Sequence, residues 1–156
     1  MLRKSGEPAR SSATERLAAA ITAAACLALL IVGARLTPNP AGYGTHTQLA
    51  IAGSRVGLQP CVWASLMGFP CATCGMTTAF AHAADGDLPS AFRVQPMGGA
   101  LAVLTATVFW LAAHQAAFGS RIGRLAGVLM GRWTLWIGLA GLGAAWVYKI
   151  MTWETG

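Results

Sequence analysis

The sequence predicts an all-α, polytopic membrane protein with three transmembrane helices and short interfacial helices that carry a CxxCG motif. Of its 156 residues, 55% are apolar and only 10% are charged, whereas a soluble domain of this size has roughly a quarter charged residues. Three apolar stretches are long enough, at 1.5 Å of rise per residue, to cross the hydrocarbon core of a bilayer. Basic and aromatic residues stand near their ends, as they do at membrane interfaces.

The first predicted span covers about residues 17–35 and contains no charge before Arg35. Residues 1–16 are polar and basic, so they cannot bury a core and are expected to be disordered. The sequence TPNP after Arg35 ends the helix, because proline lacks the backbone N–H that a helix needs. A basic start, an apolar run and small residues at its end also fit a cleaved signal peptide, and that alternative stays open.

The second and third predicted spans cover about residues 97–118 and 133–153, so residues 17–153 form a single membrane domain. Pro96 directly precedes the second span, where a missing N–H does no harm. Tryptophans bound the third span, and Lys149 near its end is expected to extend to the lipid headgroups. Between the two spans, residues 121–132 alternate basic and apolar and predict a short interfacial helix.

The distribution of basic residues predicts the orientation of the chain. Four Lys and Arg residues precede the first span and three lie in residues 119–132, against three in residues 35–96 and one, Lys149, near the C-terminal end of the third span. The positive-inside rule then places the N-terminus in the cytoplasm and the long loop outside. Because these residues flank apolar runs, the net charge of +6 points to contact with the lipid bilayer rather than with nucleic acid. An unidentified membrane or extracytoplasmic protein partner also fits this placement.

The long loop contains an apolar cysteine segment, residues 61–95, which is expected to lie on or dip into the outer leaflet. Gly68 and Pro70 break it into two pieces. Asp87 is predicted to cap a second short helix, because its side chain can accept a hydrogen bond from a free backbone N–H. The segment is therefore expected to form two or three short helices.

The pair Cys71 and Cys74 is separated by two residues, and a helix is predicted to begin near Cys71. In that helix Cys74, Thr78 and His82 recur every four residues and share one face. The positive end of the peptide dipoles favours thiolate at a helix N-terminus, which is how C-x-x-C pairs become reactive.

This arrangement predicts a thiol–disulfide redox couple of Cys71 and Cys74. Pro70 and Gly75 permit the tight chain entry that such a site needs, and Cys61 is expected to lie close enough to act as a third, resolving thiol.

Two other roles for the cysteines remain open. Cys61, Cys71 and Cys74 supply three ligands of the four that a zinc site needs, with His82 or His46 as the fourth. Alternatively, a disulfide from Cys61 to Cys71 or Cys74 staples two short helices of a non-enzymatic membrane subunit, as suits an oxidising compartment. No sequence feature separates these roles, so the sequence does not decide whether the protein is an enzyme.

Several motifs of the cysteine segment recur together in one order. They are Cys61, Gly68, Phe69-Pro70-Cys71, Cys74-Gly75, Thr77, Gly86-Asp87-Leu88, Ala91, Arg93 and Pro96. Over about residues 58–110 the chain thereby resembles a family of small bacterial membrane proteins known as domain of unknown function 2752. The resemblance implies a helical integral protein of the bacterial cytoplasmic membrane and implies no activity. Thr78 stands where that family usually has arginine, so a positive charge near the thiol pair is missing.

Overall fold

The structure, a computed structural model, describes residues 11–49, 61–120 and 132–153, and within these ranges every regular element is a helix. In chain order they are α1 (Ala13–Arg35), the 3-10 helix η1 (Thr45–Gln48), α2 (Val62–Met67), α3 (Met76–Ala84), α4 (Leu88–Val94), α5 (Pro96–Phe118) and α7 (Arg132–Met151). The predicted all-α class is confirmed. The predicted interfacial helix at 121–132 falls almost entirely outside the described residues.

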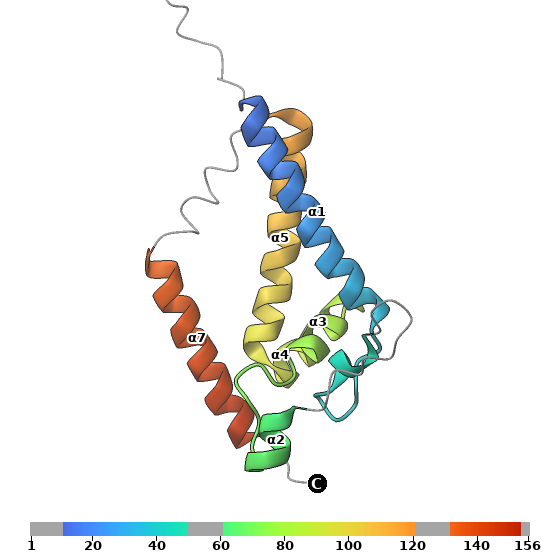
Figure 1. The fold of residues 1–156 in the computed structure, drawn as a ribbon, viewed down its shortest axis with the longest axis vertical. Helices are drawn as coiled ribbons and strands as arrows, with labels where there is room; N and C mark the ends of the chain where they lie inside the picture. The colour runs from blue at the N-terminus through green and yellow to red at the C-terminus, as the bar shows by residue number, and fades with distance from the viewer. Residues whose placement is uncertain (1–10, 50–60, 121–131, 154–156) are drawn as a thin grey trace, which may run out of the picture.

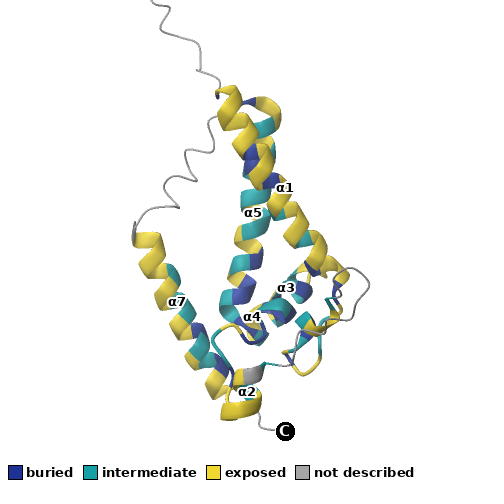
Figure 2. Cartoon of the chain, viewed as in Figure 1, coloured by how far each residue is buried: buried dark blue, intermediate teal, exposed yellow. Residues whose placement is uncertain are grey.

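Three helices are long and apolar enough to cross a membrane: α1, α5 and the Trp133–Met151 part of α7. This confirms the three predicted spans. Their large apolar side chains are exposed in the isolated chain, for example Ile21 at 63% and Trp133 at 69%. Figure 2 shows this exposure along α1 and α7. Apolar surface of this extent needs cover, and the hydrocarbon of a bilayer supplies it. The protein is therefore a multi-pass membrane protein.

The C-terminal ends of α1 and α7 and the N-terminal end of α5 lie toward the same end of the molecule (Figure 1). α1 and α5 run side by side, whereas α7 stands apart from them along much of its length and approaches the rest near its C-terminal end. The short helices α2, α3 and α4 gather at that same end. Residues 36–49 and 61–95, between α1 and α5, form a small helical cap at this end of the molecule.

Helix α1 begins at Ala13, earlier than the predicted start near residue 17. The reason is a capping box: the Ser12 side chain accepts from the Glu15 backbone, and the Glu15 carboxylate accepts from the Ser12 N–H at 2.7 Å. These bonds extend the helix into the stretch that was expected to be disordered, whose residues 1–10 lie outside the described ranges. Arg16 then donates to the carbonyl oxygen of Ala116 at the far end of α5, from Nε at 3.0 Å.

The cap packs tightly on α5 because the facing residues are small. Ala79 of α3 is completely buried, and a Cβ added to Gly98 of α5 would lie 2.9 Å from the Ala79 Cβ. As predicted, Asp87 caps α4 by accepting from the Ser90 N–H at 3.1 Å, and Pro96 is the first residue of α5. Gly86, at φ +83°, supplies the turn between α3 and α4.

The start of α3 differs from the prediction. The helix begins at Met76 rather than near Cys71, because Gly75 stands before it in the left-handed conformation at φ +89°. A residue in that conformation cannot belong to a right-handed helix. Cys71 and Cys74 therefore lie in the turn that leads into α3, and the predicted helical face shared by Cys74, Thr78 and His82 does not form.

Candidate functional site

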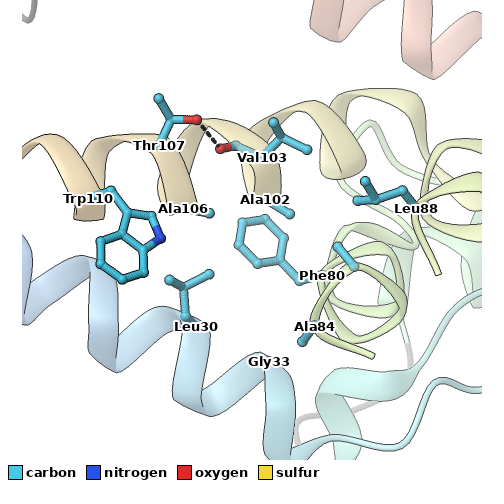
Figure 3. A pocket seen from close by; sticks show the side chains of 11 residues that line it. Leu30, Gly33, Phe80, Ala84, Leu88, Ala102, Val103, Ala106, Thr107 and Trp110 are labelled. Atoms are coloured by element: carbon cyan, nitrogen blue, oxygen red, sulfur yellow. Dashed lines mark hydrogen bonds between the residues drawn. The ribbon is translucent and has the colours of Figure 1, made fainter. Parts of the chain in front are cut away.

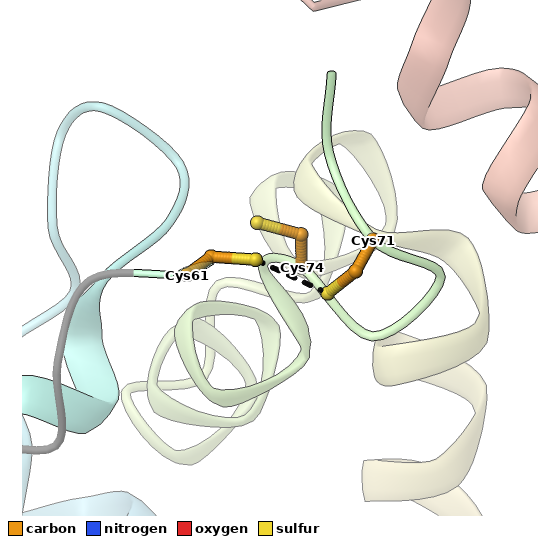
Figure 4. A group of neighbouring side chains, drawn as sticks. All are labelled: Cys61, Cys71 and Cys74. Carbon is orange, nitrogen blue, oxygen red and sulfur yellow. Dashed lines mark hydrogen bonds between the residues drawn. The ribbon is translucent and has the colours of Figure 1, made fainter. Parts of the chain in front are cut away.

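Three thiols converge at this cap (Figure 4). The sulfurs of Cys61, Cys71 and Cys74 all lie within 4.8 Å of one another, and the Cys61 and Cys71 sulfurs are 3.5 Å apart. All three cysteines are free thiols, and 3.5 Å is far longer than the roughly 2.05 Å of a disulfide. The disulfide foreseen as one alternative is therefore not formed in this structure. The thiols come from two separate stretches, one before α2 and one before α3.

Local backbone geometry brings the two stretches together. Gly68, at φ +75°, ends α2 in the left-handed conformation and donates its N–H to the carbonyl of Ala64 at 3.1 Å. Pro70, two residues further along the chain, is fully buried. The Cys74 N–H donates to the Cys71 carbonyl at 3.0 Å, so the C-x-x-C sequence forms a closed turn whose thiols face Cys61.

Hydrogen bonds hold this turn from Gln95, the residue before α5, and from α7. Gln95 is completely buried, donates from Nε2 to the Ala72 carbonyl at 3.0 Å and accepts from the Met97 N–H at 3.3 Å. From α7, the Trp146 indole donates to the Pro70 carbonyl at 2.9 Å. Neither Gln95 nor Trp146 was predicted to belong to the site. In the sequence, a polar side chain directly before Pro96 indicates only that it can cap the following helix.

Lys149 also points into the cap, and the prediction that it extends to the headgroups is wrong. Its side chain is only 6% exposed. Its Nζ donates to the carbonyl oxygens of Gly42 at 3.4 Å and Val94 at 3.3 Å, and lies 5.8 Å from the centre of the Trp153 ring. Backbone carbonyls at the cap thus take the place of the headgroups.

Cys61 and Cys74 differ in their tendency to ionise. Burial raises the pKa of Cys74 to about 12, and the charges of Cys61 and Cys71 add to that rise, while the charge of Lys149 acts in the opposite direction. Burial also opposes ionisation of Cys61, but hydrogen bonds with the Ala64 backbone and with Cys71 outweigh it and lower the pKa of Cys61. Cys61 is therefore the better nucleophile of these two thiols in the metal-free protein.

This difference predicts the order of alkylation. In reduced, metal-free protein carrying Cys26→Ser, iodoacetamide at pH 8 should modify Cys61 well before Cys74, because Cys74 is 6% exposed and keeps its proton. Peptide mass spectrometry of timed samples measures this order. Unfolding in denaturant should make the two rates alike, and a native Cys74 that reacts as fast as Cys61 would contradict the burial of Cys74 in the structure.

The other predicted site residues lie outside the thiol group. His82 Nδ1 stands 3.6 Å from the Asp87 carboxylate, and His82 is not among the described residues that group with the three sulfurs. Thr78 is buried and its hydroxyl lies 2.8 Å from that of Thr45. Thr77 is half-buried in the first turn of α3, and the exposed Arg93 accepts a hydrogen bond from the Tyr148 hydroxyl through its backbone carbonyl at 2.9 Å.

A separate apolar pocket of about 290 Å³ opens between α1, α3 and α5 (Figure 3). Its lining consists of Leu30, Gly33, Phe80, Ala83, Ala84, Leu88, Ala102, Val103, Ala106, Thr107 and Trp110. None of these side chains titrates or ligates a metal, and the Thr107 hydroxyl donates to the Val103 carbonyl at 2.8 Å. The thiol group is therefore the candidate for chemistry.

Comparison with known proteins adds a family and no activity. No curated protein and no solved structure matches the chain. One family model, described as a protein of unknown function (DUF2752), matches residues 61–110. These residues contain the three thiols, helices α2, α3 and α4 of the cap, and the first part of α5. The match confirms the resemblance seen in the sequence: over residues 61–110 the chain is similar to DUF2752.

Proposed function

We propose that the protein binds one thiophilic metal ion, of the zinc class, through the thiolates of Cys61, Cys71 and Cys74. The observation that carries this proposal is the convergence of three sulfurs from two chain segments within 4.8 Å. Thiolates that bind one zinc ion at about 2.3 Å in a tetrahedron lie roughly 3.8 Å apart. The sulfur–sulfur distances thus exceed those around a bound zinc ion by at most about 1 Å, and small rotations of the cysteine side chains remove this difference.

The surroundings of the thiols favour a metal site that is preorganised, with its ligands held in place before the ion binds. The turn from Cys71 to Cys74 is held by Gln95 and Trp146 through its backbone, so these bonds do not depend on the state of the sulfurs. A site held in this way loses little conformational freedom on binding. Three protein ligands leave a fourth position for water, a substrate or a donor from a partner protein.

A titration with Cd²⁺ tests the proposal directly. Full-length, reduced protein in detergent should bind one Cd²⁺ per chain and develop the ultraviolet charge-transfer absorbance of cadmium thiolates. Cys26→Ser, which removes the thiol in the middle of α1, is the matched control and should bind Cd²⁺ unchanged. Wild-type protein that takes up no Cd²⁺ while all its thiols remain free would overturn the proposal.

A second candidate function is thiol–disulfide exchange, favoured by the 3.5 Å contact between the Cys61 and Cys71 sulfurs. This couple differs from the predicted couple of Cys71 and Cys74. In the exchange, the disulfide of a partner takes two electrons and two protons from the two thiols and leaves as two thiols, while a Cys61–Cys71 bond forms. Incubation with oxidised glutathione followed by peptide mapping tests it. A linked Cys61–Cys71 peptide supports exchange, whereas persistent mixed glutathione adducts contradict it.

We further propose that the chain lies in the cytoplasmic membrane of a bacterium with its N-terminus inside. The supporting observations are the basic residues before α1 and in residues 119–132, and the placement of the thiol cap at the opposite end from the start of α1. A reporter active only outside the cytoplasm should therefore be active when fused after Gly156 and inactive when inserted at Gly119. The reverse labelling would put the thiols in the reducing cytosol.

A further inference from the structure

Helix α7 brings a buried cation to the thiol cap with little to balance its charge. The Lys149 ammonium carries three N–H donors, and its two carbonyl acceptors stand at 3.3 and 3.4 Å, longer than a good hydrogen bond. Within residues 11–49, 61–120 and 132–153, no carboxylate forms an ion pair with it. A buried charge in such surroundings is unstable unless an opposite charge lies close to it.

The thiol turn lies next to this ammonium. A Cβ added to Gly75 would stand 3.5 Å from the Lys149 Nζ, and Gly75 directly follows Cys74. The Lys149 ammonium, which lacks a balancing anion, thus lies beside the turn whose cysteines become thiolates in the proposed metal site.

We propose that Lys149 is the counter-cation of the metal–thiolate centre and tunes the site to divalent ions. The inference rests on the proposed function. Three thiolates carry a charge of −3, so a divalent ion leaves the centre at −1 and the ammonium brings the total to zero. A monovalent ion would leave an excess negative charge in a buried site, where an unbalanced charge is strongly unfavourable.

Two ions that give centres of different charge separate the effect of the Lys149 charge from a structural effect of its side chain. Arsenite binds three thiols without any electron transfer, since As(OH)₃ and three thiols give a neutral As(S)₃ centre and three waters. The cadmium centre with the same three thiolates carries −1. An ammonium that acts by its charge stabilises the cadmium centre and leaves the arsenic centre unaffected, whereas a purely structural lysine supports both alike.

The experiment measures Cd²⁺ and arsenite affinities of full-length protein carrying Lys149→Met, a change to an unbranched side chain that is one heavy atom shorter and carries no charge. We expect the Cd²⁺ affinity to fall about 10-fold or more, as it does when outer partners of metal ligands are removed, with arsenite affinity within about 2-fold of wild type. Lys149→Arg should restore much of the Cd²⁺ affinity. Tyr148→Phe, which removes the neighbouring hydrogen bond from α7 to the Arg93 carbonyl without a change of charge, should leave both affinities unchanged.

The outcomes distinguish the two proposals. Equal weakening of cadmium and arsenite binding in Lys149→Met, or no weakening of either, would overturn the role of Lys149 and leave the metal site in place. Wild-type protein that binds neither ion would overturn the metal site itself, and the role of Lys149 with it. Selective loss of Cd²⁺ affinity, restored by arginine, would support both.

Discussion

Replacement of Cys74 by serine should abolish tight Cd²⁺ binding, with a fall in affinity of at least about 100-fold. A metal site distributes its binding free energy over few ligands, and a serine hydroxyl keeps its proton at neutral pH, so it cannot replace a thiolate. Cys74 is only 6% exposed, and burial raises the pKa of its thiol to about 12. It therefore contributes a sulfur that only a bound metal can deprotonate near neutral pH. Competition with a chelator of known Cd²⁺ affinity measures the effect.

Two further variants make this result interpretable. Cys61→Ser changes a half-buried position before α2 and should reduce Cd²⁺ affinity similarly, with less disturbance of the packing. Cys26→Ser should bind Cd²⁺ as the wild type does. If Cys74→Ser folds and keeps wild-type affinity while Cys61→Ser loses it, the functional unit is the pair Cys61 and Cys71, and the three-thiolate site is contradicted.

Replacement of Gly75 by alanine should destabilise the fold by about 2–5 kcal/mol. The residue adopts φ +89°, and an added Cβ would lie 2.7 Å from the Gly42 carbonyl oxygen and 3.3 Å from the Val94 Cγ1. Backbone that close cannot move aside without a shift of the turn, so strain in the left-handed conformation adds to a clash. The apparent unfolding temperature in detergent should fall by about 10 °C.

Gly68→Ala is the matched control for this prediction. Gly68 also has positive φ, +75°, but a Cβ there would meet nothing within 4 Å. It should therefore show only the conformational strain of about 1–2 kcal/mol, or roughly a third of the temperature shift. Equal shifts in the two variants would contradict the close approach of the Gly42 backbone to the thiol turn.

The sequence was sufficient for the architecture because membrane spans are encoded locally. In a bilayer, the backbone N–H and C=O groups of a stretch such as residues 97–118 must pair within a helix, and its surface must be apolar, whatever it packs against. Helix caps are local as well, which is why Asp87 and Pro96 were assigned correctly. The start of α3 was not, because the periodicity of the apolar residues continues through Gly75 and only the backbone conformation of that glycine ends the helix.

The surroundings of the thiols depend on contacts between distant residues, and local patterns do not report these. Lys149 near the end of a span has the same sequence context whether it reaches the headgroups or a buried carbonyl. Trp146 likewise fits an aromatic belt, yet its indole bonds to Pro70 of the cap. The three cysteines could be identified as candidate site residues from their side-chain chemistry alone. Only the fold shows that their sulfurs lie close together.

X-ray absorption spectroscopy of the zinc-loaded, full-length protein tests the central claim most directly, because it counts the sulfur ligands of the ion and measures their distances. The metal-site proposal predicts three sulfurs at about 2.3 Å and one lighter donor at about 2.0–2.1 Å. A shell made only of nitrogen and oxygen, or one with fewer than three sulfurs, would contradict a centre built from Cys61, Cys71 and Cys74.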